Sequence, residues 1–437
     1  MSLSTKPYKG SRDFYPEDKR KQEYMFRVIR EQVSRYGYEE YDAPIIESLE
    51  LYQAKSGEEI VNDQTYKFTD RGGREVAIRP EMTPSVSRMV AARRQENAYP
   101  LRWFSIPNLW RYERPQRGRL REHWQLNVDI FGEASINAEL ELIMLTDAIF
   151  QGFKADRSTY VIKINHRQLI DRLLKEYLEL DQAQAYSMMK LLDRMHKLDK
   201  TQLISQIDEI FNSMQKANGL TEKLLAVLSA KDLAELPNEL IDSCAAVDDL
   251  RQILATCSSN QLTNVIFDIS VIRGFDYYSG IVFELNDTHP DNSRSMMGGG
   301  RYDGLVGLFG VDPIPTAGFG LGDATLANFL ELHGLMPELD SPTDIYLITP
   351  SGDYQEANKV AKDLRDQGLN IAIDYSSRKI GEQIKTAVKK GIRFTLIVGP
   401  NEINSRQYTL RDLKTTKEGQ YSLGLIGETI NKSRLKK

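Results

Sequence analysis

Cysteine is scarce in this sequence. Only Cys244 and Cys257 occur in 437 residues, and they form no CxxC motif. The five histidines show no spacing typical of metal ligands, and His196 and His333 are expected to be ordinary helix-surface residues. A disulfide framework and a structural metal site are therefore both excluded, and a reducing compartment is expected.

Long apolar runs are also missing. No stretch of about 18 apolar residues occurs, which a membrane-spanning helix would need. The first four residues, Met-Ser-Leu-Ser, do not begin the apolar core of a secretory signal. Hydrophobic residues make up 41% and charged residues 27%, as in globular proteins with a sizeable core. We therefore expect a soluble, cytoplasmic protein that has no membrane partner.

The chain has no strong net charge, but its charge is unevenly distributed. The total is -5, whereas residues 343–437 contain 17 Lys and Arg against 11 Asp and Glu. This leaves +6 on the C-terminal part and -11 on the rest. A basic module on an acidic body indicates an anionic partner such as nucleic acid; a solvated charged surface is the alternative.

The length predicts two or three domains. Apolar residues at helical spacing predict a helix over residues 18–36. Residues 41–46 are typical of a strand that Pro44 interrupts, and residues 76–79 of another short strand. The apolar, aromatic runs 101–112 and 124–131 predict a long antiparallel hairpin with a charged tip.

The second half of the chain changes character twice. Residues 167–257 are helical throughout, and residues 335–343, which contain two prolines, are typical of a linker. Beyond them, strands alternate with helices that end at Gly368 and Gly391, a pattern that predicts a small parallel α/β domain. We expect a first domain whose two parts are interrupted by a helical insertion, followed by the α/β domain. The expected boundaries are 1–165, 166–260, 261–336 and 343–437.

Five arginines lie in the predicted hairpin, at positions 111, 114, 117, 119 and 121. A guanidinium group is always charged and forks onto phosphate oxygens, so converging arginines suit a triphosphate. Glu113 and Glu122 partly neutralise this cluster, which favours a built site over a general polyanion surface. A solvated basic loop or an RNA-binding finger is the alternative.

Polar residues interrupt strands that are otherwise apolar. Gln125, Asn127 and Asp129 share one face by their two-residue spacing, and Glu81 and Thr83 follow another strand. A row of such acceptors on an inner sheet face suits an ammonium group. A polar face open to water is equally normal for an antiparallel sheet.

A third segment joins one cation to two phenol rings. Arg273 is followed by Gly-Phe-Asp and then by Tyr277 and Tyr278, which suits a carboxylate and a polar ring. A turn with core aromatic residues is the alternative. Gly298 to Gly300 would allow a ligand to approach the backbone closely.

Together these segments resemble the class II aminoacyl-tRNA synthetases, and among them the histidyl-tRNA synthetase family. The resemblance covers nearly the whole chain, because its signatures occur in the family's order. They are Lys-Gly-Ser-Arg-Asp at 9–13, the motif 1 strand around Pro44, Arg-Pro-Glu-Met-Thr at 79–83, motif 2 at 111–119, the histidine-specific signature at 273–280, Gly-Gly-Arg-Tyr-Asp-Gly at 299–304, and an anticodon-binding-like domain at 343–437.

The resemblance implies a fold and a reaction. The fold is an α+β catalytic domain with a mostly antiparallel sheet, a helical insertion and a small C-terminal α/β domain. The reaction activates L-histidine with ATP and Mg²⁺ and passes it to the 3′ end of tRNA(His). A homodimer formed through the Pro44 strand is implied too, and a tightly bound metal or organic cofactor is not.

The resemblance also implies residue roles. Arg111 and Arg273 would be catalytic. The residues implied in histidine binding are Glu81, Met82, Thr83, Gln125, Asp129, Tyr277, Tyr278 and Tyr302. Those implied in ATP binding are Arg111, Glu113, Arg119, His123 and Arg273.

Two departures from the family pattern concern ATP. Ala324 and Thr325 stand where a glutamate and an arginine usually follow the glycine-rich strand, and His123 stands where a phenylalanine commonly stacks on adenine. We expect the hairpin-tip arginines, within 117–121, to carry more of the outer phosphate. The competing hypothesis is a catalytically silent paralogue that keeps the histidine pocket as a sensor.

Overall fold

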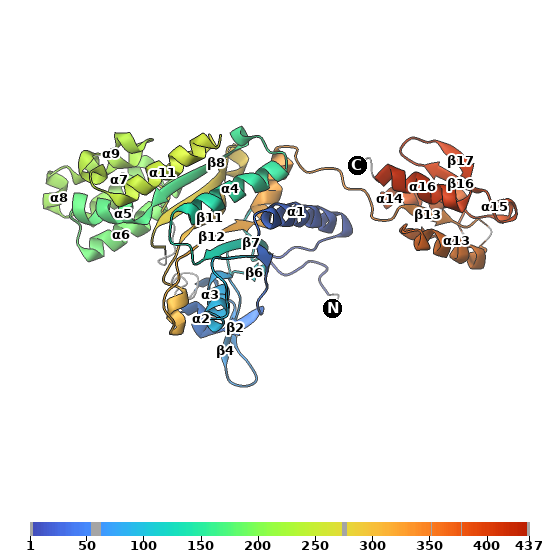
Figure 1. Cartoon of the computed structure of the whole chain (residues 1–437), viewed down its shortest axis with the longest axis horizontal. Coiled ribbons are helices and arrows are strands. Elements are labelled where there is room, and N and C mark those ends of the chain that lie inside the picture. The colour runs from blue at the N-terminus through green and yellow to red at the C-terminus, as the bar shows by residue number, and fades with distance from the viewer. Residues whose placement is uncertain (1–2, 54–62, 273–277, 351, 377, 435–437) are drawn as a thin grey trace. The chain divides into compact units, whose positions relative to one another are not determined.

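The computed structural model describes residues 3–53, 63–272, 278–350, 352–376 and 378–434. It divides into two compact units, Met1–Met336 and Pro337–Lys437, each with its own sheet (Figure 1). Among the described residues, no helix is both long and apolar enough to cross a membrane.

The first unit is built on a nine-stranded sheet whose strands are mostly antiparallel, as predicted. Only its two outermost pairs, β1–β5 and β8–β9, run parallel within the described chain. Eight of these strands follow one another in the order β1 (Glu39–Glu40), β5 (Leu101–Ser105), β7 (Glu122–Phe131), β12 (Thr316–Gly322), β11 (Ser295–Arg301), β10 (Ile281–Asp287), β8 (Tyr160–His166) and β9 (Val265–Phe267), and the ninth pairs with β7 outside this order.

The predicted hairpin forms near one edge of this sheet, next to β1. β5 pairs with the second half of β7, and β6 (Asn108–Trp110) pairs with its start. Alternation along β7 sends Leu126, Val128 and Ile130 into the main hydrophobic core. Gln125, Asn127 and Asp129 therefore belong to the opposite face, as their spacing predicted.

Helices cover the apolar face of the sheet. Figure 1 shows α1 (Pro16–Arg35) and α4 (Asn137–Gly152) lying over its strands, and α4 contacts β12. α1 confirms the predicted helix: Pro16 opens it, and Met25, Ile29 and Val33 form its buried face. α12 (Asp323–Leu332) begins directly after β12 and packs against β7.

The predicted strand 41–46 is wrong. The chain forms β1 before it and β2 (Ile46–Ser48) at its end, and the residues between make no strand. Pro44 has no N–H to donate, and the buried Arg79 binds Asp42 at 2.9 Å and the Ala43 carbonyl at 2.6 Å. β2, β4 (Glu75–Ile78) and β3 (Lys67–Thr69) form a separate three-stranded sheet.

The predicted helical run lies between β8 and β9, and the described chain there contains no strand. Its hydrophobic residues belong to the same core cluster as those of the main sheet, so the insertion does not have a separate core. Its α-helices are α5 (Arg167–Arg172), α6 (Gln182–Asp193), α7 (Lys200–Ile210), α8 (Ser213–Ala217), α9 (Leu220–Ser229), α10 (Asn238–Ile241) and α11 (Ala245–Ser259).

The second unit is an α/β domain. β14 (Ile371–Ile373), β13 (Ile345–Ile348) and β15 (Phe394–Ile397) are parallel, as predicted. The expectation of a wholly parallel sheet is wrong, because β16 (Tyr408–Asp412) and β17 (Glu418–Tyr421) add an antiparallel hairpin. The helices that accompany them are α13 (Tyr354–Asp366), α14 (Ile380–Lys389), α15 (Pro400–Ser405) and α16 (Leu423–Arg434).

A buried ion pair fixes α4 to the end of β11. The Arg301 guanidinium donates from Nε and from Nη2 to the two carboxylate oxygens of Glu139, each at 2.7 Å, and Nη2 also donates to the Ser135 carbonyl. We predict that Arg301→Ala lowers the free energy of unfolding by about 3–5 kcal/mol, because the buried Glu139 carboxylate loses its counter-charge.

Urea unfolding of the full chain measures this loss. Arg251→Ala is the control, since Arg251 pairs with Asp248 on an exposed helix surface and should change stability by less than about 1 kcal/mol. Equal urea midpoints for the two variants would contradict the prediction.

Candidate active site

A cavity of about 990 Å³ lies on the polar face of the main sheet. The hairpin, the strands β10 and β12, the start of α12 and a corner of the helical insertion all contribute to its wall. The residues of the predicted ATP-binding set that line it are Arg111, Glu113, Arg119 and His123. The structure therefore brings together the described members of that set.

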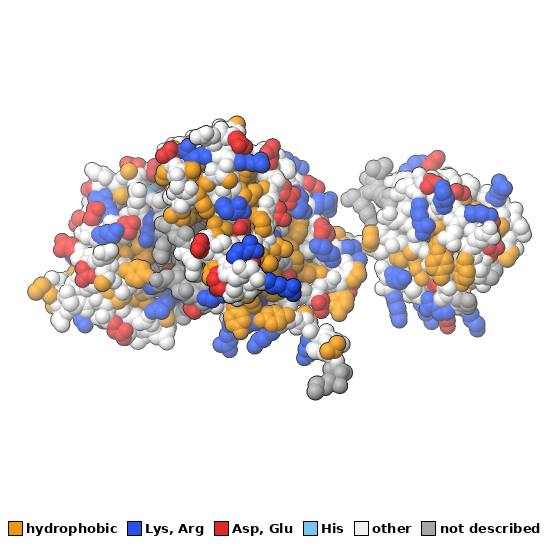
Figure 2. All heavy atoms as spheres, turned by 90° about the horizontal axis from the view of Figure 1, so that it is seen from below, with side chains coloured by type: hydrophobic (Ala, Val, Ile, Leu, Met, Phe, Trp, Pro, Cys, Tyr) orange, Lys and Arg blue, Asp and Glu red, His pale blue; other side chains and the backbone are white. Residues whose placement is uncertain are grey.

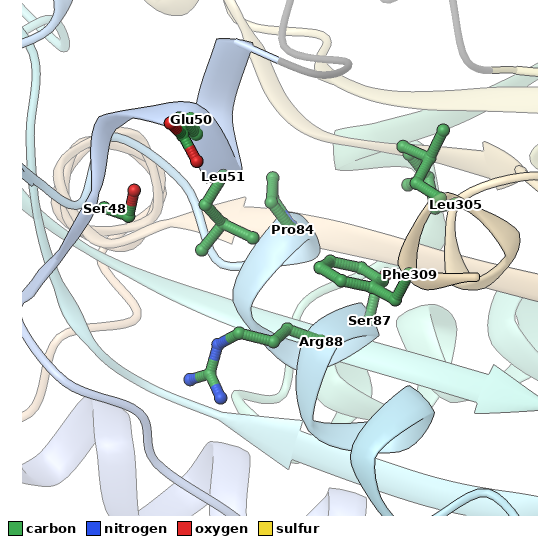
Figure 3. A pocket seen from close by; sticks show the side chains of 9 residues that line it. Ser48, Glu50, Leu51, Pro84, Ser87, Arg88, Leu305 and Phe309 are labelled. Carbon is green, nitrogen blue, oxygen red and sulfur yellow. The ribbon is translucent and has the colours of Figure 1, made fainter. Parts of the chain in front are cut away.

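A second cavity, of about 350 Å³, lies elsewhere in the first unit (Figure 3). It is bounded by α2 (Leu49–Gln53), α3 (Thr83–Ala92) and the turn Val306–Phe309. Leu51, Pro84 and Phe309 make its wall largely apolar, and its arginine, Arg88, pairs with Glu47 at 2.7 Å. The apolar wall and the paired arginine make this cavity less suitable for a phosphate group than the larger one.

Two hairpin arginines reach the larger cavity, and they differ in charge balance. Arg111 donates from Nε to the Pro80 carbonyl at 2.9 Å, which fixes the side chain, and among the described residues nothing binds the rest of its fork. Arg119 donates to both oxygens of Glu113 and is neutralised by it. Arg111 is therefore the better placed of the two to meet a phosphate group.

Arg121 does not belong to the cavity, so the expectation for this tip residue is wrong. Its guanidinium lies 3.9 Å from the centre of the Tyr112 ring and donates to the Tyr8 hydroxyl at 2.9 Å. Its Nε donates to the Glu113 carbonyl at 3.0 Å. Arg121 thus ties the hairpin to the N-terminal segment, a role that the residue spacing could not reveal.

His123 presents an uncharged ring to the cavity. Burial, with the positive charges of Arg111 and Arg12, lowers the pKa of His123 to about 3. Its Nδ1 has no hydrogen-bond partner among the described residues. A neutral ring at this position is able to stack on a purine.

Glycines keep the floor of the site open. Asp129 of β7 is paired with Gly318 of β12, and Gln125 with Gly322. A Cβ atom on Gly318 would lie 2.3 Å from Asp129 Oδ1 and 2.5 Å from the Tyr302 hydroxyl. The glycine at 318 is therefore required by close approach of these two side chains.

Asp129 is a buried carboxylate with spare acceptor capacity. It accepts a hydrogen bond from the Tyr302 hydroxyl, whose ring lies 6.4 Å from that of Tyr278. Its other oxygen, Oδ2, has no partner within the described chain. Burial raises the pKa of Asp129 to about 7. An ammonium group would supply both the missing donor and the missing charge.

The remaining residues of the predicted histidine set lie nearby or outside the described part. Glu81 and Met82 are buried just before α3, which begins at Thr83, and the Pro80 contact ties this turn to Arg111. Arg273 and Tyr277 lie outside the described residues.

Sequence reasoning missed several groups. Arg12 donates to the buried Asp323 at 2.7 Å, at the start of α12. Arg294 lines the cavity from the β10–β11 connection. His196 lines it too, and His333 pairs with Asp287 at 2.8 Å, so neither is an ordinary surface residue. Only contacts between segments far apart in the chain reveal these positions.

Comparison with known proteins agrees with the geometry. The family model for histidyl-tRNA synthetase matches residues 10–326, and that for an anticodon binding domain matches residues 344–433. The histidine–tRNA ligase of Leptospira biflexa is 44% identical over 423 residues, which cover 97% of this chain and 96% of that protein.

Solved structures share the fold. The histidyl-tRNA synthetase of Nostoc sp. superposes with a TM-score of 0.81 at 22% identity, covering 99% of this chain and 100% of that one. An ATP phosphoribosyltransferase regulatory subunit/histidyl-tRNA synthetase from Bacillus halodurans gives 0.72 at 21% identity, covering 91% and 99%. The family assignment rests on the sequence matches, because these identities establish the fold alone. The chain belongs to the histidyl-tRNA synthetase family.

Proposed function

We propose that this chain is an active histidine–tRNA ligase. One observation carries the proposal: a cavity with a fixed arginine, Arg111, lies on the same sheet face as Asp129, a buried carboxylate whose Oδ2 has no donor among the described residues. Such a site can hold a nucleotide phosphate and an amino-acid ammonium group close together. The name of the Leptospira relative supports the same activity.

The first step joins histidine to AMP. The carboxylate of L-histidine attacks the α-phosphorus of ATP, a P–O bond forms, and the bond to pyrophosphate breaks. No covalent enzyme intermediate is needed. Arg111 and, from the family resemblance, Arg273 would bind the α-phosphate as charge moves onto the departing phosphate oxygens. In the second step a hydroxyl oxygen of the terminal ribose of tRNA(His) attacks the carbonyl carbon of the adenylate. An ester bond forms, the bond from that carbon to the phosphate oxygen breaks, and AMP leaves as the hydroxyl loses its proton.

The amino acid would be held by the polar face of β7 and the turn before α3. Asp129, with Glu81, Thr83 and Gln125, supplies acceptors for the ammonium group. Tyr278 and Tyr302, with Tyr277 and Met82, would enclose the imidazole. The neutral His123 would stack on adenine while Glu113 and Arg119 face the nucleotide.

Mg²⁺ would enter with ATP and balance the negative charge of its phosphates. The residues present fit such an ion, because Glu284 and Asn286 of β10 place oxygen ligands on the cavity wall. Asn286 Oδ1 has no partner among the described residues.

The four sequence segments would divide the work. Residues 1–165 and 261–336 form the activation site, residues 166–260 extend its rim, and residues 343–437 bind the anticodon of tRNA(His). The match to an anticodon binding domain and the charge of +6 support the last role. Figure 2 shows Lys and Arg side chains standing out from this unit. The cytoplasm, where tRNA is charged, is the proposed location.

We further propose a homodimer formed around β2, which is an edge strand of its three-stranded sheet. Ile45 and Ile46 are 54% and 50% exposed there, and Phe68 of the same sheet is 43% exposed. An exposed apolar edge strand invites pairing with a second copy.

We predict that Ile46→Lys raises the dimer dissociation constant at least roughly tenfold, because it places a charge in an apolar contact. Sedimentation velocity over a concentration series measures the change. Ile266→Lys, at a similarly exposed isoleucine of β9, is the control and should stay dimeric. A wild-type monomer at micromolar concentration would refute the dimer.

Aminoacylation tests the proposed function. The full chain should charge a tRNA(His) transcript with histidine in the presence of ATP and Mg²⁺. A chain that binds histidine but transfers none to tRNA would support the sensor hypothesis instead. The fold shared with the Bacillus halodurans protein does not favour that hypothesis, because it is common to both kinds of protein.

A further inference from the structure

The start of α12 carries no arginine at the position where the family pattern expects one. Thr325 stands there, and it is 6% exposed. Its hydroxyl donates to the Gly322 carbonyl at 3.1 Å, within the same helical turn. This part of the cavity wall therefore receives no positive charge from α12, although the outer phosphates of ATP would need one.

Arg294 reaches the same place from a different element. It precedes β11, lines the cavity and is half-buried. A Cβ atom on Gly118, at the hairpin tip, would lie 3.3 Å from Thr325 Cγ2 and 3.6 Å from Arg294 Cδ. Thr325 and Arg294 thus pack against the same glycine, so the Arg294 guanidinium stem lies beside the position that lacks its arginine.

The Arg294 side chain is held in place, and no carboxylate of the described residues neutralises it. Its Nη2 donates to Gln116 Oε1, an uncharged acceptor on the hairpin tip, at 2.7 Å. Within the described chain it forms no ion pair, whereas Arg119, at the same cavity, pairs with Glu113. Because a guanidinium group has five N–H donors, most of those of Arg294 remain available to a ligand.

We propose that Arg294 binds the outer phosphates of ATP in place of the arginine absent at position 325. The proposal rests on the proposed ligase function and adds a binding residue to it. The positive charge on this part of the cavity wall would then come from the β10–β11 connection. α12 would supply only a small side chain whose hydroxyl is already hydrogen-bonded. Gln116 would orient the guanidinium when the hairpin tip meets the nucleotide.

ATP–pyrophosphate exchange tests this assignment, because it measures KM for ATP, KM for histidine and inhibition by AMP separately. Arg294→Ala should raise KM for ATP at least roughly tenfold, the loss expected from charge-assisted hydrogen bonds. KM for histidine and inhibition by AMP, which has no outer phosphates, should change by less than about twofold. Arg294→Lys should lie between the wild type and Arg294→Ala, because it keeps the charge but loses the fork.

Rescue and control variants separate binding from folding. Thr325→Arg, introduced into the Arg294→Ala chain, should recover part of the ATP affinity, since it returns an arginine to the same wall. Arg251→Ala, on the exposed face of α11, should leave all constants unchanged. Unaltered KM for ATP in Arg294→Ala, or an equal weakening of AMP and ATP, would overturn the assignment. A wild-type chain without any exchange would instead reject the ligase function.

Discussion

Replacing Arg111 with alanine is expected to slow histidine-dependent ATP–pyrophosphate exchange by roughly 100- to 1,000-fold, the effect of removing one preorganised donor at a developing charge. Arg111 is fixed through Nε by the Pro80 carbonyl, so in the proposed site the rest of its fork would meet the α-phosphate without reordering. The loss should fall mainly on kcat, because the interaction strengthens as pyrophosphate departs. Exchange kinetics at saturating ATP and histidine measure it.

Arg114→Ala is the matched control for this prediction. Arg114 lies on the same hairpin but is exposed and does not line the cavity. Its removal should change kcat by less than about twofold if the effect depends on contact with the phosphate. Comparable losses in both variants would show that Arg111 acts only through the general positive charge of the hairpin.

Asp129→Asn is expected to weaken histidine binding by roughly 100-fold, because the buried ammonium group loses its counter-charge. Asparagine keeps the shape and can still accept the hydrogen bond from Tyr302. Isothermal titration of histidine into each variant measures the loss. The affinity of the wild-type chain for histidine should also decrease as the pH drops below about 7. Burial raises the pKa of Asp129 to about 7, and the protonated acid cannot pair with an ammonium group.

The same substitution should raise stability at alkaline pH. The folded pKa of Asp129, about 7, exceeds the ordinary value of about 3.9. Between these values the folded chain holds a proton that the unfolded chain has released, so this group makes the folded state less stable as pH rises. Asp129→Asn removes that effect, and its Tm should exceed the wild-type Tm at pH 8 but not at pH 4.

Asp147→Asn provides the opposite control. Asp147 is also buried and accepts from a tyrosine hydroxyl, that of Tyr160, at 2.6 Å, but Arg157 neutralises it at 2.7 Å. Its loss should lower Tm at pH 8 and leave histidine affinity unchanged. If the Asp129→Asn variant bound histidine normally, Asp129 would not belong to the proposed histidine pocket.

Local pattern predicted much of this fold. The hairpin around the arginine cluster, the two faces of β7 and the buried face of α1 depend on residue spacing alone, and all three are confirmed. The prediction of a strand at 41–46 was wrong because Pro44 has no N–H to donate and the buried Arg79 binds the Ala43 carbonyl. The antiparallel hairpin of β16 and β17 was missed because the glycine-capped helices before it suggested a continuing parallel sheet.

The sequence predicted which residues form the site better than it predicted how their side chains are arranged. Arg111, Glu113, Arg119 and His123 meet at one cavity, as expected. The orientation of Arg121 toward Tyr112 and the approach of Arg294 to Thr325 depend on contacts between distant segments. A charged side chain can serve either a ligand or the fold, and its spacing in the sequence does not distinguish the two.

Whether the cavity activates histidine is tested most directly by ATP–pyrophosphate exchange with the unaltered full chain, Mg²⁺ and each of the twenty amino acids in turn. Exchange should depend on L-histidine and remain at background with the other nineteen. Measurable histidine binding without exchange would contradict the proposed ligase and leave a histidine sensor built on the same fold.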